Sequence, residues 1–321
     1  MNIVFCADRS VLPGLHVAAF SVLKYASPKI TEIRYFIFSD SLSDTDLNLL
    51  HKTLASLQKP FSLELRRIEA SLFNGFPSLN GSLATYYRLA VPHVLEVERF
   101  LYLDVDTLCA VDVSELNLVD LGVSPAGLVP EAPLAESVDR IVAESLGNSN
   151  IEPYFNAGII LVNVLEWRKQ RITERAMEYI ATHRPLFHDQ SALNVVLRGN
   201  AISLDERFNC IANMRKNWPA LRVPAGKIGR LIHFLDYPKP WDFFGEFVHP
   251  QYRLWRCVLN QTEMKHFRSW HSTPARKFPK TLKALTGYRK ALKEHLLFAG
   301  YSRGLLSRIK GVPCGLHGAC R

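Results

Sequence analysis

Short apolar runs alternate with amphipathic segments along the first third of the chain. Segments opened by Pro13 and by Asp44 have the apolar spacing of helices. The apolar runs between them have the length of strands, at residues 2–6, 33–38, 61–65 and 100–103. Strands that alternate with helices predict an α/β fold with a mostly parallel sheet covered on both faces.

The pattern continues less regularly to about residue 245. We expect strands or strand-like runs at 123–131, 159–163 and 231–234, and helices at 133–146, 165–183 and from 188 onward. Small polar residues at 154–158 precede the second of these strands, and they suit either close backbone approach to a ligand or a simple turn. Asp189, at the start of the last helix, is expected to cap it.

Two acidic pairs with the same spacing occur in different contexts. Asp104 and Asp106 follow a buried apolar run directly, so their carboxylates are expected at the carboxyl end of a strand. Two carboxylates this close repel each other, and a hard divalent cation relieves that repulsion. Asp44 and Asp46 instead open a helical segment, where acids are favoured by the helix dipole without a metal. We therefore interpret the first pair as a metal site and the second as capping.

Further candidate residues lie close to the ends of predicted strands. Asp8 follows the first strand, and ligands of such sheets bind beyond the carboxyl ends of the strands. Arg88 lies shortly before the acidic strand and is a candidate for ion pairing or phosphate binding. His233 ends a short strand and enters a Pro-punctuated loop with Lys239. Alone it would be an ordinary surface histidine, but the acid pair makes it a candidate metal ligand.

Composition places the chain among globular proteins. Its 321 residues are 48% hydrophobic, enough to bury a large core. The beginning of the chain lacks the features of a secretion signal, and no apolar run is long enough to span a membrane, which predicts a cytoplasmic protein. Four of the six cysteines are expected to be reduced core residues: Cys6, Cys109, Cys210 and Cys257. Cys314 and Cys320 lie in a Gly-rich tail, where we expect a free tail rather than a metal site.

The net charge of +9 is concentrated near the C-terminus. Residues 276–310 contain ten Lys or Arg and one Glu, so the net positive charge of this segment equals that of the whole chain. Leucines at broadly helical spacing among these charges predict a basic amphipathic segment, which suits the anionic inner face of a membrane. The alternative is a solvated helical hairpin packed on the α/β domain. Nucleic-acid binding is disfavoured because no recognised binding motif accompanies the charge.

Six motifs in order resemble those of the family 8 glycosyltransferases, which are retaining enzymes of the GT-A fold and include bacterial lipopolysaccharide galactosyl- and glucosyltransferases. The resemblance covers about residues 1–245. Its motifs are Phe5-Cys6-Ala7-Asp8, Ser82 to Leu89, Asp104-Val105-Asp106, Tyr154-Phe155-Asn156-Ala157-Gly158, Asp189-Gln190, and His233-Phe234 with Lys239-Pro240-Trp241.

The resemblance implies metal-dependent transfer of glucose or galactose from a UDP-sugar with retention of configuration. Asp104, Asp106 and His233 would bind the metal, with Mn²⁺ favoured over Mg²⁺. Asp189 would be the only acid near the donor sugar that could act as a nucleophile. Gln190 would lie near the anomeric carbon that reacts. Residues implied in donor binding are Cys6, Ala7, Asp8, Arg88, Asp104, Val105, Asn156, Ala157, Asp236 and Lys239, with Asp8 recognising uracil and Lys239 stabilising the departing UDP.

The chain differs from the family pattern at three places. Arg9-Ser10-Val11 stands where an aromatic residue often follows the first Asp. Asp236 takes the place of a usual glycine between the His-Phe and Lys-Pro-Trp motifs. Ser191 takes the place of a further Asp after the Asp-Gln pair. None of the three removes a predicted metal ligand.

We therefore expect a GT-A catalytic domain over residues 1–260 and a basic helical appendage over 261–321. The predicted acceptor is a glycan or glycolipid, lipopolysaccharide or another surface glycan, with the protein peripheral on the inner face of the membrane. Alternatives are a self-glucosylating or soluble-acceptor transferase, a UDP-sugar-binding module without transferase activity, and a basic nucleic-acid-binding protein. The four groups Asp104, Asp106, His233 and Lys239 favour an active enzyme over the binding module.

Overall fold

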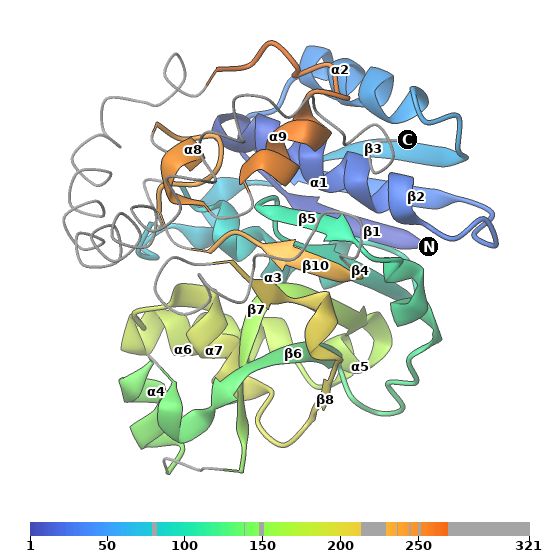
Figure 1. Cartoon of the computed structure of the whole chain (residues 1–321). Coiled ribbons are helices and arrows are strands. Elements are labelled where there is room, and N and C mark those ends of the chain that lie inside the picture. The colour runs from blue at the N-terminus through green and yellow to red at the C-terminus, as the bar shows by residue number, and fades with distance from the viewer. Residues whose placement is uncertain are drawn as a thin grey trace, which may run out of the picture.

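A mixed sheet with helices on both faces forms the body of the protein (Figure 1). The computed structural model describes residues 1–78, 82–137, 139–147, 151–212, 229–235, 237–243, 245–249 and 252–268. The basic segment 276–310, Asp236 and most of the expected appendage lie outside these residues. The domain boundary at residue 260 therefore stays a prediction.

The strands form two sheets. The large sheet has the order β3-β2-β1-β4-β7-β6-β8 and the small one the order β5-β10-β9. The strands of the large sheet are β1 (Asn2–Cys6), β2 (Ile33–Ser39), β3 (Phe61–Arg67), β4 (Arg99–Leu103), β6 (Ala126–Pro133), β7 (Pro153–Asn163) and β8 (Ala201–Ser203). Those of the small sheet are β5 (Thr107–Ala110), β9 (Cys210–Ile211) and β10 (Arg230–His233).

Nine α-helices are assigned in the described part of the chain. They are α1 (Leu12–Tyr25), α2 (Asp44–Ala55), α3 (Tyr87–Val94), α4 (Arg140–Ser145), α5 (Val164–Lys169), α6 (Ile172–His183), α7 (His188–Val196), α8 (Gly245–Val248) and α9 (Tyr252–Leu259). In the large sheet, β1, β2, β3 and β4 run parallel, while β7 runs antiparallel to both β4 and β6. The predicted mixed and mostly parallel sheet is therefore confirmed.

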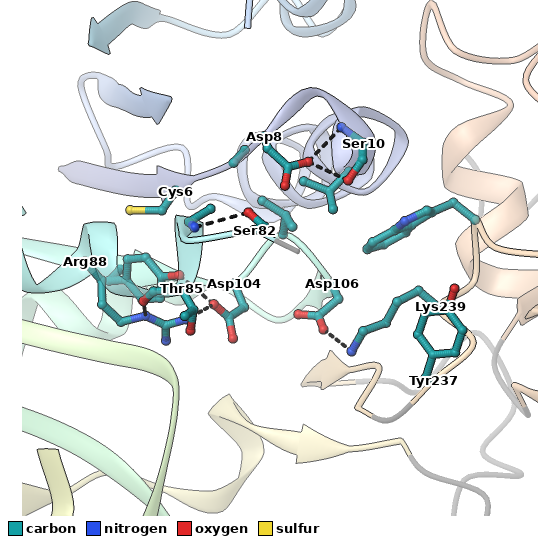
Figure 2. Close-up of a pocket in the computed structure, with 16 residues that line it drawn as sticks. Cys6, Asp8, Ser10, Ser82, Thr85, Arg88, Asp104, Asp106, Tyr237 and Lys239 are labelled. Atoms are coloured by element: carbon teal, nitrogen blue, oxygen red, sulfur yellow. Dashed lines mark hydrogen bonds and ion pairs between the residues drawn. The ribbon is translucent and has the colours of Figure 1, made fainter. Parts of the chain in front are cut away.

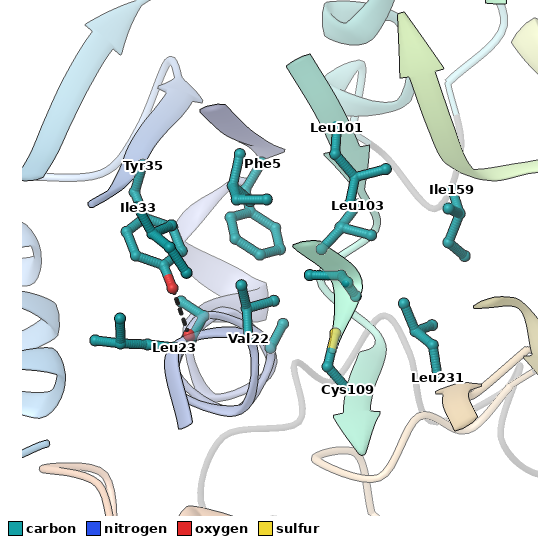
Figure 3. Close-up of a cluster of buried hydrophobic side chains, with 14 of the residues drawn as sticks. Phe5, Val22, Leu23, Ile33, Tyr35, Leu101, Leu103, Cys109, Ile159 and Leu231 are labelled. Atoms are coloured by element: carbon teal, nitrogen blue, oxygen red, sulfur yellow. Dashed lines mark hydrogen bonds between the residues drawn. The ribbon is translucent and has the colours of Figure 1, made fainter. Parts of the chain in front are cut away.

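Alternating side chains of the sheet fill two cores. Ile3 and Phe5 of β1 point to the face covered by α1 and α2, whereas Val4 and Cys6 point to the face covered by α3, α6 and α7. Figure 3 shows the first core, where Phe5 and Tyr35 lie between the sheet and Val22 of α1. Burial on both faces explains why these strands are continuously apolar.

The small sheet brings the C-terminal part of the described chain against the acid pair. β10 runs antiparallel to β5, with His233 opposite Thr107, the residue that follows Asp106. A third core, in which Trp241 and Trp255 pack on α1, holds α9 beside these strands. The close fit is visible at Gly14 of α1, where an added Cβ would lie 2.4 Å from the Trp241 ring.

Two predicted helices are wrong in length. The expected helix over 133–146 is shortened to α4, because β6 continues to Pro133 in register with Pro153 of β7. The expected helix over 165–183 is broken into α5 and α6, since Arg171 between them adopts a left-handed φ of 54°. The polar segment 154–158 belongs to β7 rather than to a turn.

Local predictions near the acids had mixed outcomes. Asp46 and Ser43 form a reciprocal capping box at α2, which confirms the interpretation of the Asp44/Asp46 pair as capping. Asp189 does not cap α7, because the N-cap position is Phe187 and the Asp189 carboxylate is turned to Thr85 and Arg88.

The cysteines largely follow expectation. Cys6 and Cys109 are free and buried, and Cys210 is free and partly buried. The prediction of a reduced thiol is wrong for Cys257, which is in a disulfide bond. None of the helices in the described residues is both long and apolar enough to cross a bilayer.

Candidate active site

The acid pair lies in the tight turn between β4 and β5. The Asp104 amide donates to the Gly158 carbonyl of β7 at 2.7 Å, and the Thr107 hydroxyl donates to the Asp104 carbonyl at 2.7 Å. The amide of Phe234, in the loop after β10, donates to the Asp106 carbonyl at 2.8 Å. These contacts from three separate segments fix the backbone of the turn and therefore the directions of both carboxylates.

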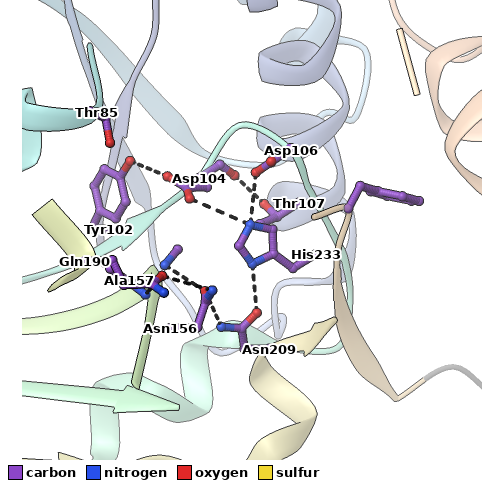
Figure 4. Close-up of polar contacts among 12 residues, drawn as sticks. Thr85, Tyr102, Asp104, Asp106, Thr107, Asn156, Ala157, Gln190, Asn209 and His233 are labelled. Carbon is purple, nitrogen blue, oxygen red and sulfur yellow. Dashed lines mark hydrogen bonds and ion pairs between the residues drawn. The ribbon is translucent and has the colours of Figure 1, made fainter. Parts of the chain in front are cut away.

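His233 completes a three-residue cluster with the two acids (Figure 4). Its Nε2 lies 3.1 Å from Asp106 Oδ1 and 3.7 Å from Asp104 Oδ2. One ligand atom from each residue lies within 4.8 Å of the others, and His233 is 1% exposed. The three predicted metal ligands are thus brought together.

The chemistry of these atoms fits a cation. Asp106 Oδ1 and His233 Nε2 are buried and close, yet neither has a hydrogen-bond partner among the described residues. His233 Nδ1 faces Asn209 Oδ1 at 2.9 Å, an arrangement that places the ring proton on Nδ1 and the lone pair on Nε2. Two lone pairs pointed at each other repel, and a divalent ion between them turns that repulsion into ligation.

A glycine makes room for the cluster. A Cβ built on Gly158 would lie 2.2 Å from His233 Cε1 and 2.9 Å from Asp104 Oδ2. Any side chain at this position would therefore collide with the imidazole ring and crowd the Asp104 carboxylate. Gly158 therefore allows close approach of side chains from the β4–β5 turn and from β10.

Arg88 of α3 lies at the centre of a buried ionic network. Its guanidinium pairs with Asp104 at 2.9 Å and with Asp189 at 3.0 Å, and it donates to the Ala157 carbonyl. It also lies over the Tyr102 ring at 4.4 Å. Burial opposes the charge of Arg88, but the two carboxylates raise its pKa. The sequence left ion pairing and phosphate binding open for Arg88. The structure shows ion pairing, in which Arg88 orients two acids.

Lys239 provides the second cation of the site. Its ammonium group lies 2.5 Å from Asp106 Oδ2 and donates to the Phe234 carbonyl at 2.8 Å. Burial of Asp106 opposes its ionisation, but the Lys239 ammonium group holds its pKa well below the usual range. Asp106 is therefore a carboxylate at neutral pH, with one oxygen toward Lys239 and the other toward His233.

Two pockets meet at the acid pair. The first, of about 200 Å³, lies beside β1 and includes Cys6, Ala7 and Asp8 (Figure 2). The second, of about 420 Å³, lies between β7 and α7. Their shared wall consists of Thr85, Arg88, Asp104, Asp106 and Lys239. A ligand that occupied both pockets would pass directly over the candidate metal site.

Every predicted site residue in the described part of the chain lines one of these pockets. The first contains Cys6, Ala7, Asp8, Arg88, Asp104, Val105, Asp106 and Lys239. The second adds Asn156, Ala157, Asp189, Gln190 and His233. Asp8 also caps a short helical turn by accepting from the Ser10 amide at 2.8 Å.

Sequence reasoning missed several residues that position the site. Asn209 orients His233, Thr85 donates to Asp189, and the Tyr102 hydroxyl donates to Asp104. Thr85 lies inside the motif Ser82 to Leu89, and Tyr102 lies in the apolar run directly before the acid pair, so closeness in sequence to the predicted site was an available signal. Asn209 lies in an irregular segment before β9 and has no sequence pattern that marks it.

Asn209→Ala is expected to weaken metal binding about tenfold to a hundredfold, because it frees the His233 ring to rotate and to change tautomer. The measurement is calorimetric titration with Mn²⁺. Asn200→Ala is the control, since Asn200 also bonds through its side-chain amide, to Gln170 at 2.5 Å, but lies outside the described site. Unchanged Mn²⁺ affinity in Asn209→Ala would contradict this orienting role.

Two solved glycosyltransferase structures are similar in fold to this chain. Galactosyltransferase LgtC, in complex with donor and acceptor sugar analogs, matches with a TM-score of 0.69 and 23% identity, covering 82% of this chain and 96% of that one. GlyE from Streptococcus pneumoniae TIGR4 matches with a TM-score of 0.61 and 17% identity, covering 85% of this chain and 64% of that one. These likenesses show the GT-A glycosyltransferase fold.

The chain belongs to glycosyl transferase family 8, whose pattern matches residues 2–245. It is similar to lipopolysaccharide 1,2-glucosyltransferase of Escherichia coli K12, with 23% identity over 96% of this chain and 89% of the relative. Lipopolysaccharide 1,3-galactosyltransferase of Salmonella typhimurium is 27% identical over 79% of this chain and 76% of the relative. General stress protein A of Bacillus subtilis is 25% identical over 81% and 96%. The resemblance seen in the motifs is confirmed.

Proposed function

We propose that this protein transfers glucose or galactose from a UDP-sugar to a hydroxyl of a saccharide acceptor, with retention of configuration and with a divalent metal. The observation that carries the proposal is the cluster of Asp104, Asp106 and His233 at the junction of two pockets. A nucleoside diphosphate sugar has three parts, and this arrangement offers a place for each.

The first pocket is assigned to the uridine part of the donor. The backbone at Cys6 and Ala7 and the side chain of Asp8 line it at the carboxyl end of β1. The Asp8 carboxylate is held by Ser10, which leaves it suited to accept from the N–H edge of uracil. Val105, between the two acids, lies on the same wall.

The metal site is assigned to the diphosphate. Asp104, Asp106 and His233 would hold the ion, and their mixed oxygen and nitrogen atoms favour Mn²⁺, with Mg²⁺ as the alternative. The bound ion would stabilise negative charge on the departing UDP. Lys239 adds a positive charge on the same side, directed by its pairing with Asp106.

The second pocket is assigned to the donor sugar and the acceptor. Asn156, Ala157, Asp189 and Gln190 line it, with Arg88 at its inner wall. Hydroxyls of a hexose match these donors and acceptors. Burial raises the pKa of Asp189, against the opposing effect of Arg88, and its two oxygens are directed at Thr85 and Arg88. This pairing favours sugar binding by Asp189 over nucleophilic attack.

Retention is then best explained by displacement on one face of the sugar. The bond from the anomeric carbon to the phosphate oxygen breaks, and a bond to the acceptor oxygen forms on the same face. The acceptor proton passes to the leaving phosphate oxygen, which balances the charge. Without a covalent intermediate at Asp189, the role of the second pocket is to orient the two sugars.

The acceptor proposed is a growing lipopolysaccharide or another surface glycan. Its support is the similarity to relatives named lipopolysaccharide glucosyl- and galactosyltransferases. The test incubates the protein with Mn²⁺, UDP-glucose or UDP-galactose and truncated lipopolysaccharide, and reads the anomeric proton coupling of the product. An α-linked hexose is expected. Donor binding with neither transfer nor hydrolysis would favour the UDP-sugar-binding module instead.

We also propose that the basic segment 276–310 holds the enzyme at an anionic membrane surface. Its ten basic residues and one acid support this placement, and the lipid-linked acceptor would be found there. A chain truncated after residue 268 is expected to lose sedimentation with phosphatidylglycerol vesicles. Full activity of the truncated chain on both soluble and vesicle-bound acceptors would instead favour the soluble-acceptor transferase.

A further inference from the structure

A continuous series of hydrogen bonds connects the candidate metal ligand His233 to the buried carboxylate of Asp139. The series crosses from the small sheet to β7 and α7 and ends at the N-terminus of α4. Its members in order are His233, Asn209, Asn156, Gln190, Tyr154 and Asp139. Figure 4 shows the part from His233 to Gln190. We call these six residues the relay.

The direction of the first half is set by a backbone amide. Asn156 Oδ1 accepts from the Gly158 amide at 3.0 Å and from Asn209 Nδ2 at 2.9 Å. The Asn209 side chain therefore presents its oxygen to His233, and that oxygen only accepts. The proton between them must come from His233 Nδ1, so in the neutral ring Nε2 holds the lone pair that faces the acids.

The second half has the same direction. Gln190 Oε1 accepts from Asn156 Nδ2 at 3.2 Å and from the Ala157 amide at 3.1 Å. Gln190 Nε2 then donates to the Tyr154 hydroxyl at 3.3 Å. Tyr154 can accept this bond because its own proton is donated to Asp139 Oδ2 at 3.1 Å.

Asp139 is suited to end the relay. Its side chain is 1% exposed and also receives the hydroxyl proton of Ser191, the residue that replaces the family's usual Asp after Asp189-Gln190. An ionised carboxylate accepts but cannot donate, so every donor in the relay points toward it. Hydrogen bonds aligned in one direction polarise and strengthen one another, and those to a charge are stronger still.

We propose that Asp139 and Tyr154 are positioning residues that act through the relay on two groups of the active site. They hold His233 in the tautomer that leaves Nε2 free for a metal. They also fix the orientation of the Gln190 amide, because Tyr154 accepts from Nε2 while the Gln190 oxygen accepts from Asn156 and Ala157. Gln190 therefore meets the substrate with its remaining N–H and acts as a donor. The inference rests on the metal site of the proposed function, and its test measures Mn²⁺ binding to that site.

The test compares two buried tyrosines. Tyr154→Phe removes the hydroxyl between Gln190 and Asp139. Tyr35→Phe is the matched control, because Tyr35 is equally buried and its hydroxyl donates at 3.0 Å to the Ala19 carbonyl, outside the relay. Calorimetric titration with Mn²⁺ is expected to show affinity about threefold to tenfold weaker for Tyr154→Phe and unchanged for Tyr35→Phe.

A second variant and a second observable complete the test. Asp139→Asn keeps a side chain that caps α4 well but lowers the acceptor strength at the end of the relay, and it should weaken Mn²⁺ binding in the same direction. In the metal-free protein, long-range ¹H–¹⁵N spectra should show His233 protonated on Nδ1 in the wild type and a mixture of tautomers in Tyr154→Phe. Equal Mn²⁺ affinity and equal spectra for Tyr154→Phe and wild type would overturn the inference, whereas absence of Mn²⁺ binding in the wild type would overturn the metal site itself.

Discussion

Asp106→Asn is expected to lower the rate of hexose transfer by at least about a thousandfold. The substitution removes one candidate metal ligand and the carboxylate that pairs with Lys239 at 2.5 Å. Loss of the metal removes several kcal/mol of stabilisation of the departing phosphate, and each ~1.4 kcal/mol is a factor of ten in rate. The measurement is steady-state transfer with the preferred UDP-sugar at saturating Mn²⁺.

The acid pair of α2 provides the control for this substitution. Asp44 is exposed in the first turn of the helix, and its pair has the same spacing as the acids of the site. Asp44→Asn should lower stability by no more than about 0.5 kcal/mol and leave transfer unchanged. Transfer by Asp106→Asn within tenfold of the wild type, with its Tm retained, would rule out Asp106 as an essential ligand.

Gly158→Ala should have the next largest effect, although it adds only one methyl group. That group would lie 2.2 Å from His233 Cε1 and 2.9 Å from Asp104 Oδ2, so two of the three ligands must move apart. We expect Mn²⁺ affinity to fall at least about a hundredfold, since ligand geometry within a few tenths of an ångström decides binding. Overpacking should also cost about 1–3 kcal/mol of stability.

Gly229→Ala is the matched control for the added methyl group. A Cβ at Gly229 meets no described atom within 4 Å, so this variant should bind Mn²⁺ as the wild type does. Titration calorimetry gives the affinities, and thermal unfolding separates loss of the site from loss of the fold. Wild-type affinity in Gly158→Ala would show that the cluster tolerates the displacement and is not a rigid ligand set.

Much of the fold followed from local pattern. Continuous apolar runs indicated strands buried on both faces, and polar residues at their carboxyl ends indicated the edge of the sheet where Asp8 and the acid pair lie. Context also separated the two acid pairs, since Asp46 forms a capping box and Asp106 does not lie in a helix. These features depend on residues within a few positions of one another, which is why sequence alone predicted them.

The errors arose where distant contacts override local preference. Asp189 has the sequence position of a helix cap, but a buried Arg88 from another helix holds its carboxylate instead. The helix expected over 133–146 is shortened because pairing with β7 extends β6 to Pro133. Asn209 went unrecognised because its role depends on the fold bringing an irregular segment beside His233.

The central claim is that the cluster of Asp104, Asp106 and His233 binds a UDP-sugar through a divalent ion. The most direct test is calorimetric titration of the wild type with UDP-glucose and with UDP-galactose, in Mn²⁺ and in EDTA. We predict binding of one of the two donors in Mn²⁺ and its loss in EDTA. Binding of neither donor in Mn²⁺, or equal binding in EDTA, would contradict the claim.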